Sequence, residues 1–468
     1  MESSLFERAR GEDAALLALV LAGVILRAYF GWAAAGYVAA PMLVAYIVLE
    51  WPRLRGNARA LVLVSAIVAI WAALVTRSAW PILDGLVRAC FYPAFLAALG
   101  FLRDAAGSSP MVARAGRYLV DQPPARRYVA LTFGGHIFGI LLNMGGLALL
   151  AGMLKQENTL ESADGDARRL AIRERRMTLA VMRGFAAMPM WCPLSITMAM
   201  LFSLTPGAHW NEYAPYGLGL TAVYLTLGWL FDYLQYPRGV ATKPERDPLG
   251  WTAALAMLVQ IAAITLIALA LERVTKIPFV THVLVVVPAF ALGWLILQNL
   301  RLGALGAAVE AARALAERSA IAFPSYANEV TLFATSGFLG AMIPALLPPD
   351  AVQAALAGLH LSTQLLSVVI VLAVAGLGMI GLNPMITLTL LLGALAHSPV
   401  EGLSPLKLVI LSAGAWSLSN GLSPLNGSMV LLSNIVKVPS ETITLRWNGA
   451  FAGATIALFC AAIYFASP

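Results

Sequence analysis

Apolar stretches long enough to cross a membrane recur along the whole chain. The 468 residues are 60% hydrophobic and only 12% charged, and the mean hydropathy is +0.79. No soluble domain of this size has such a composition. Because backbone N–H and C=O groups inside a lipid bilayer must find partners within their own segment, these stretches have to be helices. The composition therefore predicts an all-α polytopic membrane protein with the lipid bilayer as its surroundings.

The cysteines and the charge argue against several other classes. Cys90, Cys192 and Cys460 lie in apolar segments without metal-ligand spacing, which argues against disulfides and against a metal centre. The net charge of +7 comes from basic residues scattered over short loops, so we expect no nucleic-acid partner. We also expect no cofactor beyond a coupling ion, Na+ or H+.

The distribution of Lys and Arg predicts the orientation in the membrane. With the N-terminus in the cytoplasm, most basic loop residues fall on the cytoplasmic side, and Arg77, Arg273, Lys276 and Lys407 fall outside. The first apolar stretch lacks a cleavage site and is expected to remain as a helix. We predict a multi-pass protein of the cell inner membrane, with the N-terminus cytoplasmic and the C-terminus periplasmic.

Two apolar segments are interrupted in the same way. Residues 179–204 contain Pro193, and residues 407–434 contain Pro424. Aligning these prolines also aligns Leu194 with Leu425, Thr197 with Ser428 and Met198 with Met429. In the predicted orientation the two segments run in opposite directions, as in inverted-topology repeats. A pair of broken helices in corresponding positions is typical of the substrate site of a secondary transporter.

An apolar stretch with a central Asn precedes each broken helix. Asn143 lies in residues 128–153 and Asn383 in residues of about 366–397, and each stretch is predicted to form a re-entrant hairpin. A helix that breaks at membrane depth turns free N–H groups toward anions and free C=O groups toward cations. The hairpin tips and breaks are therefore the predicted site.

The predicted architecture has two inverted repeats after one additional helix. We expect the extra N-terminal helix over residues 1–37, a first repeat over 38–235 and a second repeat over 236–468. Each repeat contains scaffold helices, one hairpin and one broken helix, and the chain has about 11 transmembrane helices in all.

The predicted substrate- and ion-binding residues lie at a hairpin tip or a break and contribute an amide, a hydroxyl, or a Pro or Gly that frees the backbone. They are Asn143, Gly145, Pro193, Ser195, Thr197, Asn383, Pro384, Thr387, Ser423, Pro424, Asn426, Gly427 and Ser428. We expect no catalytic residue and no metal ligand among them.

Several polar residues have a structural alternative. The two Asn side chains can equally be hydrogen-bond links between helices. His136 is either a proton carrier for coupling or a packed histidine. Arg183 is expected to extend toward the cytoplasmic interface. Asp84 and Arg88, four residues apart, are expected to form an ion pair in the scaffold.

In this arrangement the chain resembles the ion-transporter superfamily, and within it the divalent anion/sodium symporter family. The resemblance covers nearly the whole chain as architecture, and it implies amphipathic arms at Ser109–Val120 and Asp350–Gln364. Asn143 and Asn383 match the central residue of the family's Ser-Asn-Thr hairpin tips, although their neighbours here differ. The resemblance implies a secondary active transporter, a homodimer, that moves a small carboxylate-like anion by alternating access.

Two other functions remain open from the sequence. The same scaffold occurs as the membrane subunit of a binding-protein-dependent transporter. A membrane-embedded lipid-carrier transferase is the enzyme alternative, but it normally needs clustered titratable residues at one membrane face. The external loops here are short, so we predict that the chain is not an enzyme.

Overall fold

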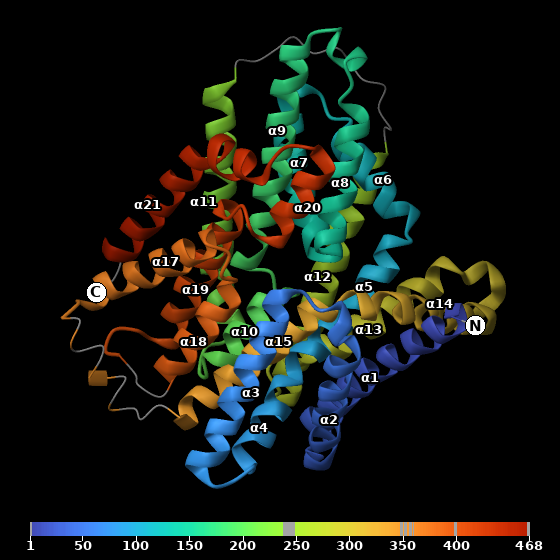
Figure 1. Ribbon diagram of the computed structural model, residues 1–468. Coiled ribbons are helices and arrows are strands. Elements are labelled where there is room, and N and C mark those ends of the chain that lie inside the picture. The colour runs from blue at the N-terminus through green and yellow to red at the C-terminus, as the bar shows by residue number, and fades with distance from the viewer. Residues whose placement is uncertain are drawn as a thin grey trace.

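The chain folds into helices joined by short loops in a computed structural model (Figure 1). The structure describes residues 2–236, 249–346, 360–396 and 400–465, with isolated positions between 350 and 358. The described α-helices are α1 (Glu2–Phe30), α2 (Ala33–Glu50), α3 (Gly56–Thr76), α4 (Trp80–Ala89), α5 (Phe91–Gly107), α6 (Pro110–Val120), α7 (Pro124–Leu142), α8 (Met144–Glu157), α9 (Ala167–Ala186), α10 (Ile196–Leu204), α11 (Trp210–Gln235), α12 (Gly250–Thr275), α13 (Phe279–Gln298), α14 (Gly303–Ser325), α15 (Ala327–Leu346), α17 (Thr363–Met379), α18 (Pro384–Ala396), α19 (Pro405–Leu422), α20 (Gly427–Val436) and α21 (Gly449–Phe465).

Helix length and composition confirm the prediction of an all-α polytopic membrane protein. Within the described residues, seven helical segments are long and apolar enough to cross a membrane, with α4 and α5 counted as one segment, Trp80–Gly107. The hairpin and broken helices are each interrupted, so most of them are too short to count as a complete span.

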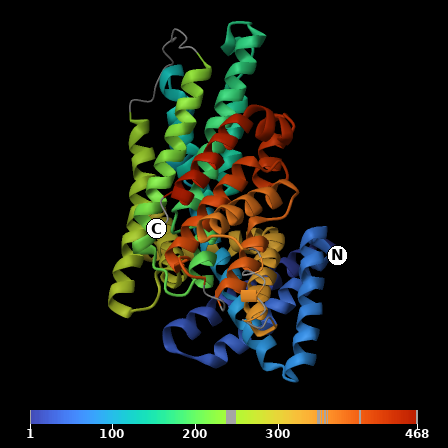
Figure 2. The same cartoon turned by 90° about the vertical axis from the view of Figure 1, so that its left-hand side faces the viewer.

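The helices form two groups at opposite ends of the molecule. Helices α1 to α4 lie at one end in both views, and the ends of α7, α8 and α9 lie at the other (Figures 1 and 2). In the first group, α1 packs on α2, and α15 packs on α3, α4 and α5. In the second group, α7 packs on α9, α17 packs on α19, and α20 packs on α8.

Helices α7 and α8 form a tight hairpin. The turn is the single residue Asn143, whose φ of 51° is in the region that favours glycine. Gly146 allows the close approach, because a Cβ atom there would overlap the carbonyl oxygen of Phe138. Helices α17 and α18 form the second hairpin, which turns at Gly381 with a φ of 91° and restarts at Pro384. Proline suits the first position of a helix, where no N–H partner is needed.

Both predicted breaks are present as helix ends with polar caps. Helix α9 ends at Ala186, and α10 restarts at Ile196 under a cap from Ser195. Helix α19 ends at Leu422, and α20 restarts at Gly427 under a cap from Asn426. Capping side chains accept the N–H groups that a helix start leaves free.

The first hairpin and the first broken helix touch backbone to backbone. A Cβ atom on Gly135 of α7 would overlap the carbonyl oxygen of Val181, and one on Gly184 of α9 would overlap that of Thr132. Small residues permit this spacing between membrane helices. Hairpin and broken helix are therefore packed as one unit.

Two peripheral helices correspond to predicted amphipathic segments. Helix α6 occupies the first predicted arm, whereas the second, Asp350–Gln364, lies partly outside the described residues. The Ala-rich segment 304–319, with the charged residues Glu310, Arg313, Glu317 and Arg318, has the pattern of an amphipathic surface helix. It forms part of α14, which packs on α1, α5 and α13 and carries the exposed ion pair Arg313–Glu317. In each half of the chain a hairpin is followed by a broken helix and a single helix; the residue boundaries of the two repeats stay a prediction.

Candidate functional site

The first hairpin tip leaves hydrogen-bonding groups free. The carbonyl of Asn143 accepts from the N–H groups of Gly146 and Leu147 at 3.0 and 3.3 Å. Within the described part of the chain, the Asn143 side-chain amide and the N–H groups of Met144 and Gly145 have no hydrogen-bond partner. Asn143 is half-buried and Gly145 is exposed. This tip can therefore donate hydrogen bonds to a ligand.

The second hairpin tip is more self-contained. The side-chain oxygen of Asn383 accepts from the N–H of Met385 at 3.0 Å and so caps α18. Pro384 is buried beside it. One turn on, the Thr387 hydroxyl oxygen is buried and has no partner among the described residues. Asn383 therefore serves its own helix in this structure, while Thr387 keeps an unused hydroxyl.

The second break is organised by its own polar side chains. The Asn426 side-chain oxygen accepts from both the N–H and the hydroxyl of Ser428 at 3.2 Å, and its amide donates to Asn420 at 2.6 Å. Pro424 is buried, whereas Gly427 is exposed. The Gly427 N–H has no acceptor within the described residues.

Both hairpin tips reach this second break. On one side, a Cβ atom on Gly427 would lie 3.3 Å from the terminal methyl carbon of Met144. On the other side, a Cβ atom on Gly381 would lie 3.0 Å from the side chain of Leu425. We call the region formed by residues 143–145, 381–383 and 423–428 the second-break site. Figure 1 shows α20, which begins there, beside α8.

A hydrogen bond ties the second hairpin to this site. The Ser423 hydroxyl donates to the carbonyl oxygen of Gly378 at 2.6 Å. One turn earlier, the buried Ser419 hydroxyl faces Gly378 and has no partner among the described residues. Unpartnered buried hydroxyls of this kind call for a bound water or ion.

The first break is closed by its own surroundings. Pro193, Ser195 and Thr197 are all buried, and the Ser195 hydroxyl donates to the Cys192 carbonyl and accepts from the Met198 N–H. Two further side chains donate hydrogen bonds to backbone carbonyl groups that the break leaves without a helical partner. Tyr213 donates to the Met190 carbonyl, and Trp210 donates to the Trp191 carbonyl. The structure therefore gathers both tips around the second break and leaves the first break as packed interior.

His136 has the geometry of a packed neutral histidine. Its Nδ1 lies 3.0 Å from the Gly184 carbonyl oxygen, and its Nε2 lies 2.8 Å from the indole nitrogen of Trp191. Because the indole N–H can only donate, Nε2 must accept, and Nδ1 then carries the proton that it donates to Gly184. The ring links the first hairpin to the first break.

The structure corrects the expectation for Arg183. Its side chain does not extend to the interface: the residue is 2% exposed and hydrogen-bonds to Asn448, which is fully buried. Asn448 in turn donates to the Gly421 carbonyl at 2.9 Å, at the end of α19. Asn448 is not among the predicted site residues, although a strongly polar residue at the start of an apolar segment is a signal of function.

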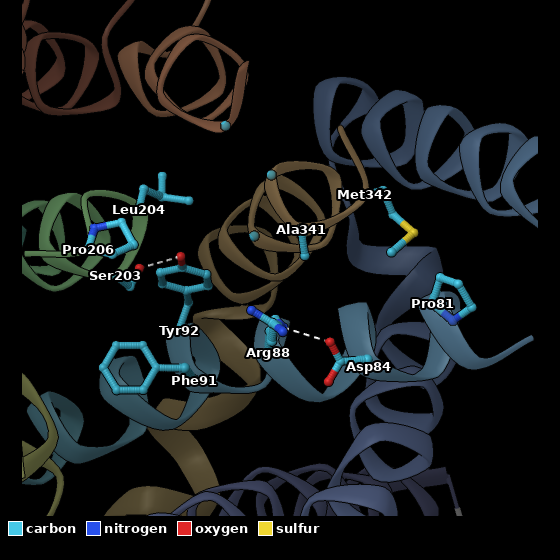
Figure 3. Close-up of a pocket in the computed structure, with 13 residues that line it drawn as sticks. Pro81, Asp84, Arg88, Phe91, Tyr92, Ser203, Leu204, Pro206, Ala341 and Met342 are labelled. Carbon is cyan, nitrogen blue, oxygen red and sulfur yellow. Dashed lines mark hydrogen bonds and ion pairs between the residues drawn. The ribbon is translucent and has the colours of Figure 1, made fainter. Parts of the chain in front are cut away.

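The described cavities lie away from the second-break site. One of about 600 Å³ lies between α4, α5 and α15 and the ends of α10 and α18 (Figure 3). Figure 3 shows the predicted Asp84–Arg88 ion pair on its wall, with Arg88 Nε 2.7 Å from the carboxylate, and Tyr92 meeting Ser203 of α10 at 2.7 Å. A neighbouring cavity of about 340 Å³ shares Ser203. Both cavities are lined by α5 and by the end of α10.

Comparison with known proteins supports the fold. No protein-family model and no curated protein matches this sequence. The chain is similar in structure to the YdaH transporter of Alcanivorax borkumensis, with a TM-score of 0.52 at 14% identity. The match covers 80% of this chain and 86% of that one. The chain therefore has the fold of a solved membrane transporter, and the more specific resemblance to divalent anion/sodium symporters stays a prediction.

Proposed function

We propose that this protein is a secondary active transporter that moves a small carboxylate-like anion across the cell inner membrane by alternating access. The observation that carries the proposal is the set of free donors at the second-break site. The contact between Met144 and Gly427 brings two sets of free donors together. The first hairpin tip contributes the Asn143 amide and the N–H groups of Met144 and Gly145, and the second break contributes the Gly427 N–H.

These donors suit an anion for an electrostatic reason. Helices α8 and α20 both begin at the site, and the N-terminal end of a helix carries a partial positive charge. Backbone N–H groups at such ends bind carboxylates and similar oxyanions without a basic side chain. Three other predicted residues of the site, Asn383, Ser423 and Asn426, form hydrogen bonds that hold the backbone of the second hairpin and the second break in place.

A coupling cation has a second set of ligands available. Helix α19 ends at the site, so its last carbonyl groups point toward it, and the Ser419 hydroxyl beside Gly378 is unpartnered within the described residues. Neutral oxygens of this kind are ligands for hard cations such as Na+. Proton coupling through His136 is less favoured, because both ring nitrogens are already hydrogen-bonded.

The division into two helix groups supports the mechanism. The backbone contact at Gly135 and Gly184 holds the first hairpin to its broken helix, and Ser423 holds the second hairpin to the other. The cavity at Asp84 and Arg88 lies between the scaffold helices α4, α5 and α15 and the ends of α10 and α18, which belong to the first broken helix and the second hairpin. Alternating access would be motion of one group against the other across this cavity.

The bilayer and a second copy of the chain are the proposed partners. Helix α3 exposes a run of large apolar side chains, among them Ile67, Ile70 and Leu74. Such a surface needs lipid or another protein to cover it. We propose that the scaffold helices form a homodimer in the membrane.

Ligand-dependent stabilisation of the purified protein tests the proposal. Carboxylates should raise the unfolding midpoint, and Na+ should enlarge the effect over K+ at matched ionic strength, because two ligands of one site strengthen each other's binding reciprocally. Ser428→Ala deletes a hydroxyl at the second break without adding volume and should weaken the stabilisation by carboxylate and Na+, while Ser325→Ala, on the exposed end of α14, serves as control. Stabilisation by a lipid-linked or nucleotide-activated donor alone would contradict the proposal in favour of an enzyme.

A further inference from the structure

Arg183 is the most buried cation among the described residues and binds only neutral groups. Its Nε donates to the Asn448 side-chain oxygen at 2.9 Å, and one terminal nitrogen donates to the Tyr128 hydroxyl and the Gly228 carbonyl at 2.9 and 3.0 Å. The guanidinium lies over the ring of Phe451 at 4.1 Å. All four partners are buried.

The charge of Arg183 has no matching carboxylate. Asp232, the buried acid on the neighbouring helix α11, is fully engaged by Arg176, which donates to both of its oxygens at 2.9 and 2.7 Å. Within the described residues no acid forms an ion pair with Arg183. A buried and unpaired charge is costly, and one partner of opposite sign reduces that cost.

Arg183 lies where the two broken helices cross. It is in the last turn of α9, and Ala186 at the end of that helix lies 3.7 Å from the Cβ position of Gly421 in α19. Asn448 bridges the guanidinium to the Gly421 carbonyl, two residues before Ser423 and the second-break site. The carbonyl ends of α9 and α19 offset part of the charge, and the full charge of the guanidinium exceeds the partial charge of either helix end.

We propose that Arg183 is the fixed positive charge that makes the second-break site select an anion over a neutral analogue of the same shape. It acts as a positioning residue that touches no substrate: it holds the end of α19 through Asn448, and its field adds to that of the helix N-termini. The inference rests on the proposed function. The solute then carries at least one net negative charge at the moment of binding.

The test compares each acid with its amide, which has similar size and no charge. Binding of benzoate, benzamide, succinate and succinamide is measured by calorimetry on the purified full-length protein. Wild type should bind at least one acid well above its amide. Arg183→Gln should weaken the acid by about tenfold or more and leave the amide unchanged, because a fixed charge in a water-excluded region acts on a charged ligand and not on a neutral one. Arg183→Lys should retain the preference, and Tyr128→Phe, which removes a hydrogen bond without changing the charge, should retain it too.

A second pair of variants covers the case in which Arg183→Gln does not fold. Asn448→Asp places a carboxylate beside Nε and neutralises the guanidinium without removing it, so the preference for the acid should fall. Asn448→Ala loses the bond to Gly421 without adding charge, and it should weaken acid and amide together.

One result would overturn the inference and leave the transport proposal standing. It is an unchanged acid-to-amide ratio in folded Arg183→Gln or Asn448→Asp, whether both affinities stay the same or fall by the same factor. Wild-type protein that binds no acid or amide would overturn both proposals.

Discussion

Replacing Asn143 by glycine separates a ligand role from a structural one. Asn143 has φ of 51° and ψ of −128°, a conformation that glycine adopts freely and other residues only with strain. Relief of this strain raises the free energy of unfolding by about 1 to 2 kcal/mol. The greater freedom of glycine in the unfolded chain lowers it by about 0.5 to 1 kcal/mol. We therefore expect Asn143→Gly to be as stable as wild type, or up to about 1.5 kcal/mol more stable.

Transport by the same variant should be lost, because the free amide at the first hairpin tip is gone. If Asn143 were only a hydrogen-bond link between helices, its deletion would instead lower the free energy of unfolding by about 0.6 to 2 kcal/mol. The assays are unfolding in detergent and solute uptake in proteoliposomes. Asn143→Ala, which keeps the strained φ, serves as the matched variant and should be no more stable than wild type. Normal uptake by a fully stable Asn143→Gly protein would refute the ligand role.

Further predictions concern packing and topology. Gly184→Ala should destabilise the protein by about 1 to 3 kcal/mol through overpacking between α7 and α9, whereas Gly219→Ala, with open space around it, should be neutral or stabilising; equal unfolding midpoints would contradict the backbone contact. Ser423→Ala should cost about 1 kcal/mol, measured by denaturation, and an unchanged stability would mean that the bond to the second hairpin contributes nothing. A cysteine at Gly207 should react with an impermeant reagent from outside and one at Asp166 only from the cytoplasm; labelling from the same side would contradict the predicted orientation.

The helix breaks could be predicted because their causes are local. Proline at Pro193 and Pro424 removes a helical hydrogen bond, and both breaks appear where these residues fall. The start of the first broken helix was predicted at residue 179, but α9 begins at Ala167. Hydropathy locates the membrane-embedded part, whereas an N-cap from Asp166 and a run of charged residues extend the same helix beyond it.

The composition of the site depends on partners distant in sequence. Nothing near Pro193 indicates that Trp210 and Tyr213 satisfy the carbonyls of the first break. In the same way, Arg183 was expected to reach the interface because its partner Asn448 lies 265 positions further along the chain. Local pattern therefore predicts which backbone can open, and tertiary packing decides which opening is left free.

Solute accumulation is the most direct test of the central claim that the second-break site carries an anion across the membrane. Purified protein in sealed proteoliposomes is given radiolabelled carboxylates under separately imposed Na+ and H+ gradients, with Asn143→Gly vesicles as control. We predict that at least one carboxylate accumulates above its external concentration, that collapse of one of the gradients abolishes this, and that the control vesicles do not accumulate it. Absence of gradient-driven uptake of every carboxylate by correctly folded wild-type protein would contradict the account.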